Sequence, residues 1–163
     1  MHIKITKKYL FFDKYKVKCA VGKRGIRKKK KEGDFITPIG TFKIKFIYYR
    51  RDKIKKLQTN LKKKPINKSI VWCDDPRSKQ YNQLIKYPFK YSSEKLYRND
   101  NIYDIILVLN FNMNPIKKSK GSAIFIHIAK KKFESTKGCV AVRKVDLLRI
   151  IKHLKKNSKI RIF

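Results

Sequence analysis

Apolar and polar residues alternate with a period of two near the start of the chain. Between residues 14 and 21 every second residue is apolar: Tyr15, Val17, Cys19 and Val21. This period places successive side chains on opposite faces of a strand. The apolar stretch at 9–12 precedes it after a short polar turn, so the two segments predict a β-hairpin. Cys19 then lies on the apolar face, as a core thiol.

The same alternation returns at Phe42, Ile44, Phe46 and Tyr48, which predicts another half-buried strand. Before it, TPIG at 37–40 has Pro at the second and Gly at the fourth position, the preference of a type I turn. Residues 50–70 are polar, lysine-rich and weakly periodic, so we expect a long excursion. Residues 71–82 are expected to form a loop that turns at Asp74, Asp75 and Pro76.

Continuous apolar runs dominate the second half. IYDIILVLNFN at 102–112 and GSAIFIHIA at 121–129 predict two buried strands, and CVAV at 139–142 a short third one. Residues 144–156 carry an apolar stripe at helical spacing, with Asp146 in the first turn and Lys155 and Lys156 in the last. KIRIF at 159–163 is expected to be a final strand. These elements predict one mainly β domain over residues 1–163.

The formal net charge is +34, with 45 Lys and Arg against 11 Asp and Glu. Such a charge suits an anionic partner, such as nucleic acid or a cell-wall polymer. The basic runs fall in separate segments, so we favour compositional bias over a dedicated nucleic-acid surface. The N-terminus lacks the apolar core of a signal peptide, and no apolar run reaches transmembrane length. We therefore expect a soluble monomer that starts in the cytoplasm.

Cys139 and His127 are the candidates for chemistry. A thiol is nucleophilic only as thiolate and needs a nearby base. His127 lies in the buried run 121–129 with Phe125 on its face, and a loop back would bring Cys139 beside it. Taken singly, such a His or Cys is more often structural. Together with Gly138, which permits a sharp turn, and with the backbone N–H groups of 137–139, which can form an oxyanion hole, they predict a site with a cysteine nucleophile. The Lys137 charge is expected to favour the thiolate.

These segments resemble a known family. The strand histidine followed by TKGCV, together with GDFITPIGTFKI, WCDDP and EKLYRNDNIYD, resembles the catalytic domain of the YkuD-like L,D-transpeptidases of bacterial cell walls, in a compact single-domain subgroup. The resemblance runs from about Gly22 to the C-terminal helix. It implies a mixed β-sandwich with a C-terminal helix followed by a final strand.

The resemblance also implies a reaction on peptidoglycan stem peptides or muropeptides. Cys139 would attack the carbonyl before a terminal D-amino acid, and His127, oriented by the Ile128 carbonyl, would move the protons. The backbone N–H groups of Lys137, Gly138 and Cys139, already identified as a possible oxyanion hole, would hold the oxyanion. An amine would resolve the thioester, and water in its place would make a carboxypeptidase or amidase. No cofactor is implied. A non-enzymatic nucleic-acid-binding protein is the alternative of another class.

Five residues are candidates for substrate binding: Thr136, Arg98, Asn110, Tyr97 and Trp72. Trp72 can instead pack its own turn, and Tyr97 can belong to the core. Many family members have Arg where this chain has Ala141, a position for which Arg143 or Arg98 can substitute. Cys73 fits no zinc spacing, so we expect no metal site. The family acts outside the cytoplasmic membrane, which conflicts with the missing signal peptide.

Overall fold

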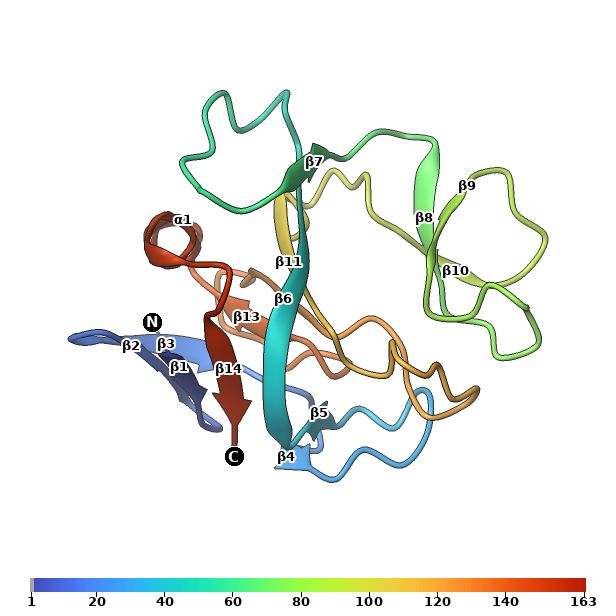
Figure 1. The fold of residues 1–163 in the computed structure, drawn as a ribbon, viewed down its shortest axis with the longest axis horizontal. Helices are drawn as coiled ribbons and strands as arrows, with labels where there is room; N and C mark the ends of the chain where they lie inside the picture. Colours follow the sequence, from blue (N-terminus) through green and yellow to red (C-terminus); the bar gives the residue numbers. More distant parts are fainter. Residues whose placement is uncertain (1) are drawn as a thin grey trace.

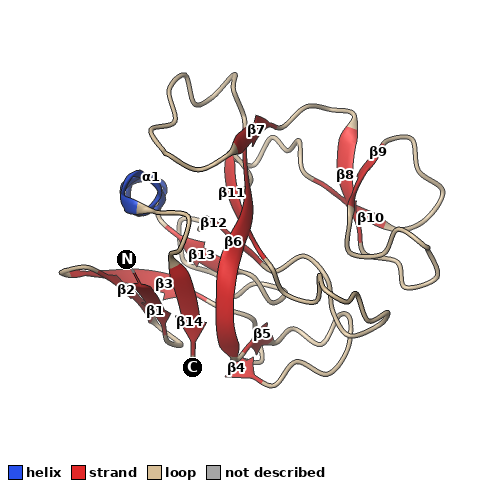
Figure 2. Cartoon of the chain, viewed as in Figure 1, coloured by secondary structure: helices blue, strands red, loops and turns tan. Residues whose placement is uncertain are grey.

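The computed structural model describes residues 2–163, and strands dominate it (Figures 1 and 2). The elements are β1 (His2–Ile5), β2 (Tyr9–Phe12), β3 (Tyr15–Ala20), β4 (Ile26–Arg27), β5 (Thr37–Pro38), β6 (Gly40–Tyr49), β7 (Lys63–Pro65), β8 (Ile70–Cys73), β9 (Leu84–Lys86), β10 (Ser93–Lys95), β11 (Ile105–Leu109), β12 (Phe125–Ile128), β13 (Val140–Val142), α1 (Lys144–His153) and β14 (Lys159–Ile162). The expected mainly β fold with a late helix and a final strand is confirmed.

The large sheet has the order β11-β12-β13-β3-β2-β1-β14-β6-β7, and β11 also pairs with β6. The pairing therefore runs full circle, with parallel pairs such as β12–β13 among antiparallel ones. The ten-residue strand β6 makes this closure: its first part pairs with β14 and its second part with β11. Figure 1 shows β6 running from the end near β4 and β5 to the end near β7.

The main core lies inside this circuit. The inward faces of β1, β2, β3 and β14 meet those of β11, β12 and β13, and α1 adds Leu147, Ile150 and Ile151. A second core covers the other face of β11 and β12. There, Ile106, Val108 and Phe125 pack against residues of the β8–β10 region, including Trp72 and Leu96. Because β11 and β12 are buried on both faces, their sequences are continuous apolar runs without alternation.

The smaller sheet has the order β10-β8-β9. In Figure 1 it lies on the side of the molecule away from β1, β2 and β3. Its central strand β8 contains Trp72 and Cys73, both buried, where the sequence predicted a loop. The apolar triplet at 71–73 was too short to be separated from the turn residues that follow it.

Three further expectations were wrong in detail. The helix ends at His153, not at 156, so Lys155 and Lys156 lie beyond its last turn. Val145 was expected in the apolar stripe, but its side chain is 53% exposed, while Asp146 is buried and bonded to Arg143. The type I turn expected at 37–40 is also absent, because Thr37 and Pro38 form the short strand β5 against β4.

Candidate active site

Cys139 and His127 come from the neighbouring parallel strands β12 and β13. The register pairs Ile126 with Val140 and His127 with Ala141, so Cys139 lies level with Phe125, just before β13 begins. Cys139 packs on the same side as Phe125, opposite to Val140 and Ile126, which face the main core. Alternation along each strand puts His127 and Cys139 on one face, two residues apart along the strand direction.

The Cys139 thiol lies against the start of β12. Its Sγ donates to the Ala123 carbonyl at 3.2 Å and accepts from the Phe125 N–H at 3.4 Å. Cys19 and Cys73 are buried, whereas Cys139 is partly exposed. Cys139 is therefore the most exposed of the three cysteines in the described range.

His127 is buried, and its Nδ1 lies 2.9 Å from the Ile128 carbonyl oxygen. A carbonyl only accepts, so we assign the proton of the neutral ring to Nδ1. The Nε2 lone pair then has no hydrogen bond from any residue in the range 2–163. Burial lowers the pKa of His127 to about 4, against the opposing effect of the Ile128 hydrogen bond. The ring is therefore a neutral base at neutral pH.

Burial, followed by the charge of Glu94, raises the pKa of the Cys139 thiol to about 12. At neutral pH the pair is thus a neutral thiol beside a neutral imidazole. The nearby cation whose charge favours the thiolate is Lys29, where the sequence pointed to Lys137. The Lys29 ammonium is itself buried, at 2.5 Å from Asp34.

The turn before the cysteine is fixed by two threonines. Thr136 Oγ1 donates to the Cys139 carbonyl at 2.6 Å and accepts from the Gly138 N–H at 3.1 Å. Thr37 Oγ1 donates to the Gly138 carbonyl at 2.8 Å and accepts from the Gly22 N–H at 2.8 Å. Gly138 has a φ of +140°, and a Cβ there would lie 3.0 Å from the Ile36 carbonyl oxygen. This position therefore requires glycine.

These bonds change which donors are free to hold an oxyanion. The N–H of Gly138 is engaged by Thr136. The N–H groups of Lys137 and Cys139 take part in no hydrogen bond among residues 2–163. Two of the three expected donors are thus available, and the third serves the turn.

The structure gives the five substrate-binding candidates different surroundings. Trp72 is buried against Phe125 and donates from Nε1 to Asn82, so it is a core residue. Tyr97 lies under the Arg50 guanidinium, 3.5 Å from ring centroid to Cζ. Asn110 accepts from the Lys43 N–H and ties β11 to β6. Thr136 is engaged within the turn.

Arg98 lies beside Tyr103, the ring that packs against His127. Its Cζ is 5.5 Å from the centroid of the Tyr103 ring, although its guanidinium also binds Asp100 at 2.5 Å. Arg143, the other suggested substitute for the missing arginine, is held by Asp146 at 2.7 Å. Neither arginine is free of a carboxylate.

Sequence reasoning missed Tyr103 and Glu94. The Tyr103 ring stands edge-on to His127, with centroids 5.3 Å apart, and also contacts Phe125. Its hydroxyl donates to Glu94 Oε1 at 2.5 Å. Both residues lie in the segment 94–104, which was singled out only as a family-like stretch. Thr37 was missed as well, because the sequence predicted only a turn at 37–40.

The chain matches the L,D-transpeptidase catalytic domain family (YkuD) over residues 3–162, which is nearly its whole length. It belongs to the L,D-transpeptidase catalytic domain family. No curated protein matches the chain. Since the match includes His127, Cys139 and the turn between them, the site described above lies within the family's domain.

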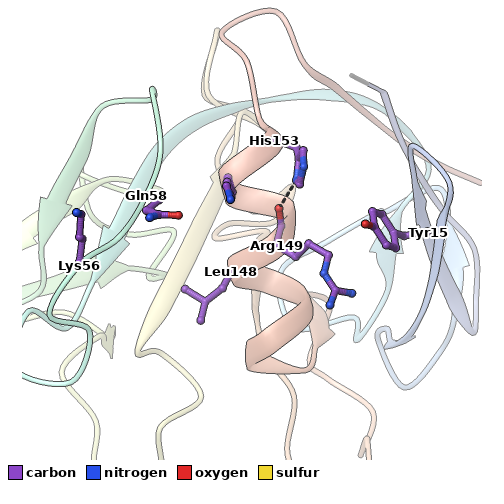
Figure 3. A pocket seen from close by; sticks show the side chains of 7 residues that line it. Tyr15, Lys56, Gln58, Leu148, Arg149 and His153 are labelled. Carbon is purple, nitrogen blue, oxygen red and sulfur yellow. Dashed lines mark hydrogen bonds between the residues drawn. The ribbon is translucent and has the colours of Figure 1, made fainter.

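Other parts of this L,D-transpeptidase domain offer less chemistry. The hollow in Figure 3 is lined by Tyr15, Arg149 and His153 among others, and no acid or thiol lines it. Residues 2–163 hold no group of three His, Cys, Asp or Glu side chains placed to share a metal ion. Within the same range, no helix has the length and apolar character needed to cross a membrane.

Proposed function

We propose that the chain is a cysteine-dependent acyltransferase that acts on peptidoglycan stem peptides. The observation that carries the proposal is the family match, in which the partly exposed thiol and the buried histidine come from adjacent strands. The family implies peptidoglycan substrates. The site has the parts of an acyl transfer: a thiol nucleophile, an imidazole base and two free backbone N–H donors.

The first half-reaction begins with the neutral pair. His127 Nε2 takes the thiol proton as Sγ bonds to the carbonyl carbon of the residue before a terminal D-amino acid. The backbone N–H groups of Lys137 and Cys139 stabilise the oxyanion of the tetrahedral intermediate. When the C–N bond breaks, the imidazolium gives its proton to the leaving amine. The D-amino acid departs, and a thioester remains on Cys139.

The second half-reaction reverses these roles. An acceptor amine adds to the thioester carbonyl and loses a proton to His127. The C–S bond then breaks, and the thiolate takes the proton back. The product is an amide cross-link, and water in place of the amine would yield a free acid.

Transfer of the proton must accompany attack, because the pKa values of the two groups disfavour a resting ion pair. The neutral thiol is protected from unwanted reactions until a substrate excludes water from the face. The Ile128 carbonyl keeps the proton on Nδ1, so the Nε2 lone pair is available for the thiol.

The test is intact-mass spectrometry after exposure to a carbapenem, which the family resemblance implies as an acylating agent. The wild type should gain the mass of one carbapenem, and Cys139→Ala should gain none. Cys73→Ala is the matched control: Cys73 is a buried thiol outside the site, so this variant should still be acylated. A folded, reduced wild type without a mass gain would contradict the proposal. An adduct that persists in Cys139→Ala would show that another residue is the nucleophile.

A further inference from the structure

Acidic side chains are scarce in this chain, and most of them have a cationic partner. Seven of the eleven form salt bridges: Asp34, Asp52, Asp75, Asp100, Asp104, Glu134 and Asp146. With 45 Lys and Arg present, a carboxylate without a cation is unexpected. Two such carboxylates, Asp74 and Glu94, lie together.

Glu94 points toward the face that carries the nucleophile. It lies in β10 directly opposite Trp72 of β8. Alternation puts it on the same side of the small sheet as Leu96, and both Trp72 and Leu96 pack against β11 and β12. The Trp72 ring contacts Phe125, whose N–H binds Cys139 Sγ. The charge of Glu94 acts on the thiol strongly enough to be the second cause of its raised pKa.

One oxygen of the Glu94 carboxylate is hydrogen-bonded, and the other has no partner within residues 2–163. Tyr103 Oη donates to Oε1, and the Tyr103 ring packs against His127. Oε2 has no hydrogen bond among the described residues. Close by, the N–H of Asp74 donates to the Ser92 carbonyl beside β10, and Asp74 Oδ1 is buried without any partner. A buried acceptor without a partner, such as Asp74 Oδ1, is costly, and the free Oε2 of Glu94 leaves a second acceptor for a ligand.

Neighbouring cations do not fill this role. The Arg98 guanidinium is engaged by Asp100, and Lys137 is exposed and forms no ion pair within residues 2–163. The carboxylate also works against the thiolate, so it does not serve to activate Cys139. Burial raises the pKa of Glu94, against the opposing charges of Arg98 and Lys137, so a cationic group that enters the site would further favour its charged form.

We propose that Glu94, fixed by Tyr103, binds the ammonium group of the amine acceptor, takes one of its protons to free the lone pair that adds to the thioester, and so favours transfer over hydrolysis. This inference rests on the proposed acyl transfer and names the acceptor class of that site: a primary amine that is protonated in solution. Glu94 is thus a specificity residue for the second half-reaction. Water, the competing acceptor, has no charge for Glu94 to bind.

The test compares two acceptors on one thioester. Wild type and Glu94→Gln are given a tetrapeptide stem with D-alaninamide, whose amine is mostly charged at neutral pH, or with hydroxylamine, which is mostly uncharged. In Glu94→Gln, KM for D-alaninamide should rise about tenfold or more, and product should shift to the hydrolysed stem. The hydroxylamine reaction should stay within about twofold, and carbapenem acylation should be as fast or faster.

Tyr103→Phe is the companion variant, since it keeps the ring against His127 and removes only the bond to Glu94. It should show a smaller change in the same direction. Equal losses with both acceptors, or an unchanged KM for D-alaninamide, would overturn the role of Glu94. A wild type that is acylated but only hydrolyses would overturn it too, leaving the acylation intact. A wild type that is never acylated would remove the proposed function itself.

Discussion

His127 and His153 make nearly the same local hydrogen bond in very different surroundings. The Nδ1 of His127 lies 2.9 Å from the Ile128 carbonyl oxygen, and the Nδ1 of His153 lies 2.8 Å from that of Arg149 (Figure 3). Both bonds assign the ring proton to Nδ1. His127, however, is buried in β12 beside Tyr103, whereas His153 is exposed at the end of α1.

The comparison shows that a hydrogen bond from Nδ1 to a backbone carbonyl does not by itself make a histidine a catalytic base. A fixed tautomer presents a lone pair at Nε2, but a base also needs an acid to deprotonate. His127 has Cys139 on the adjacent strand, whereas the hollow at His153 has no thiol or acid in its lining. Burial and a neighbouring nucleophile, not the bond to the backbone, distinguish the two histidines.

The largest expected effect comes from exchanging each ring for glutamine. His127→Gln should lower the rate of Cys139 acylation by a carbapenem about 10²–10⁴-fold, the usual contribution of a general base. His153→Gln keeps the helix face and should change the rate less than twofold. Stopped-flow or time-resolved mass measurements give both rates. Equal losses in the two variants would mean that the comparison fails.

The pH dependence of stability is the next largest effect. The pKa of His127 is about 4 in the folded protein and usually 6.5, so between these values the unfolded chain binds more protons. The free energy of unfolding should therefore fall as pH drops from about 6.5 to about 4, and this contribution should level off below that. The loss from this group is about 3 kcal/mol, at ~1.4 per pKa unit.

Urea titrations of wild type and His127→Gln at several pH values measure this loss. The variant should lack this part of the pH dependence, while His153→Gln should retain it. The same slope in His127→Gln and wild type would assign the loss to other groups.

Thr37→Val tests whether the turn before Cys139 places the thiol for His127. The substitution keeps the shape but leaves the Gly22 N–H and the Gly138 carbonyl without their buried partner. We expect a loss of about 2 kcal/mol in the free energy of unfolding, with slower acylation because the turn no longer holds Cys139. Thr41→Val, on the exposed face of β6, should cost less than ~0.5 kcal/mol. Comparable losses in chemical denaturation would show that Thr37 has no special part in the turn.

Much of the fold could be predicted because the periodicity of apolar residues in the sequence matches the burial of the side chains in the strands. The hairpin of β2 and β3, the alternating strand β6 and the buried strands β11 and β12 all appear where the pattern indicated. The alternation in 121–129 also separated Ile126 and Ile128 from Phe125 and His127. The first two lie in the main core, Phe125 lies in the second core, and His127 packs against Tyr103 of that second core. Failures came where tertiary contacts override local signals, as with β8 and β5.

The candidate site was predictable only in part, for a physical reason. Cys139, His127 and Gly138 carry chemistry or backbone freedom that a sequence motif displays. Tyr103 and Glu94 belong to no recognisable catalytic sequence motif. Tyr103 lies beside His127, and Glu94 is bonded to Tyr103, only because the fold packs their segment there. Trp72 shows the reverse error: its type suggested a binding surface, but its burial makes it part of the core.

The smallest expected effect is a rise in the pKa of His127 when the buried ring is made more accessible to water, as His153 already is. Tyr103→Ala removes the ring that stands edge-on to His127 and lets water approach the imidazole. Because burial is the main cause of its low pKa, the pKa of His127 should rise by about one unit toward 6.5, as followed by NMR titration of the ring protons. Tyr15→Ala, which opens the hollow near His153, should leave the pKa of His127 unchanged. A pKa that stays near 4 without Tyr103 would mean that the strands β11–β13 alone keep water from the ring, and that Tyr103 serves only to hold Glu94.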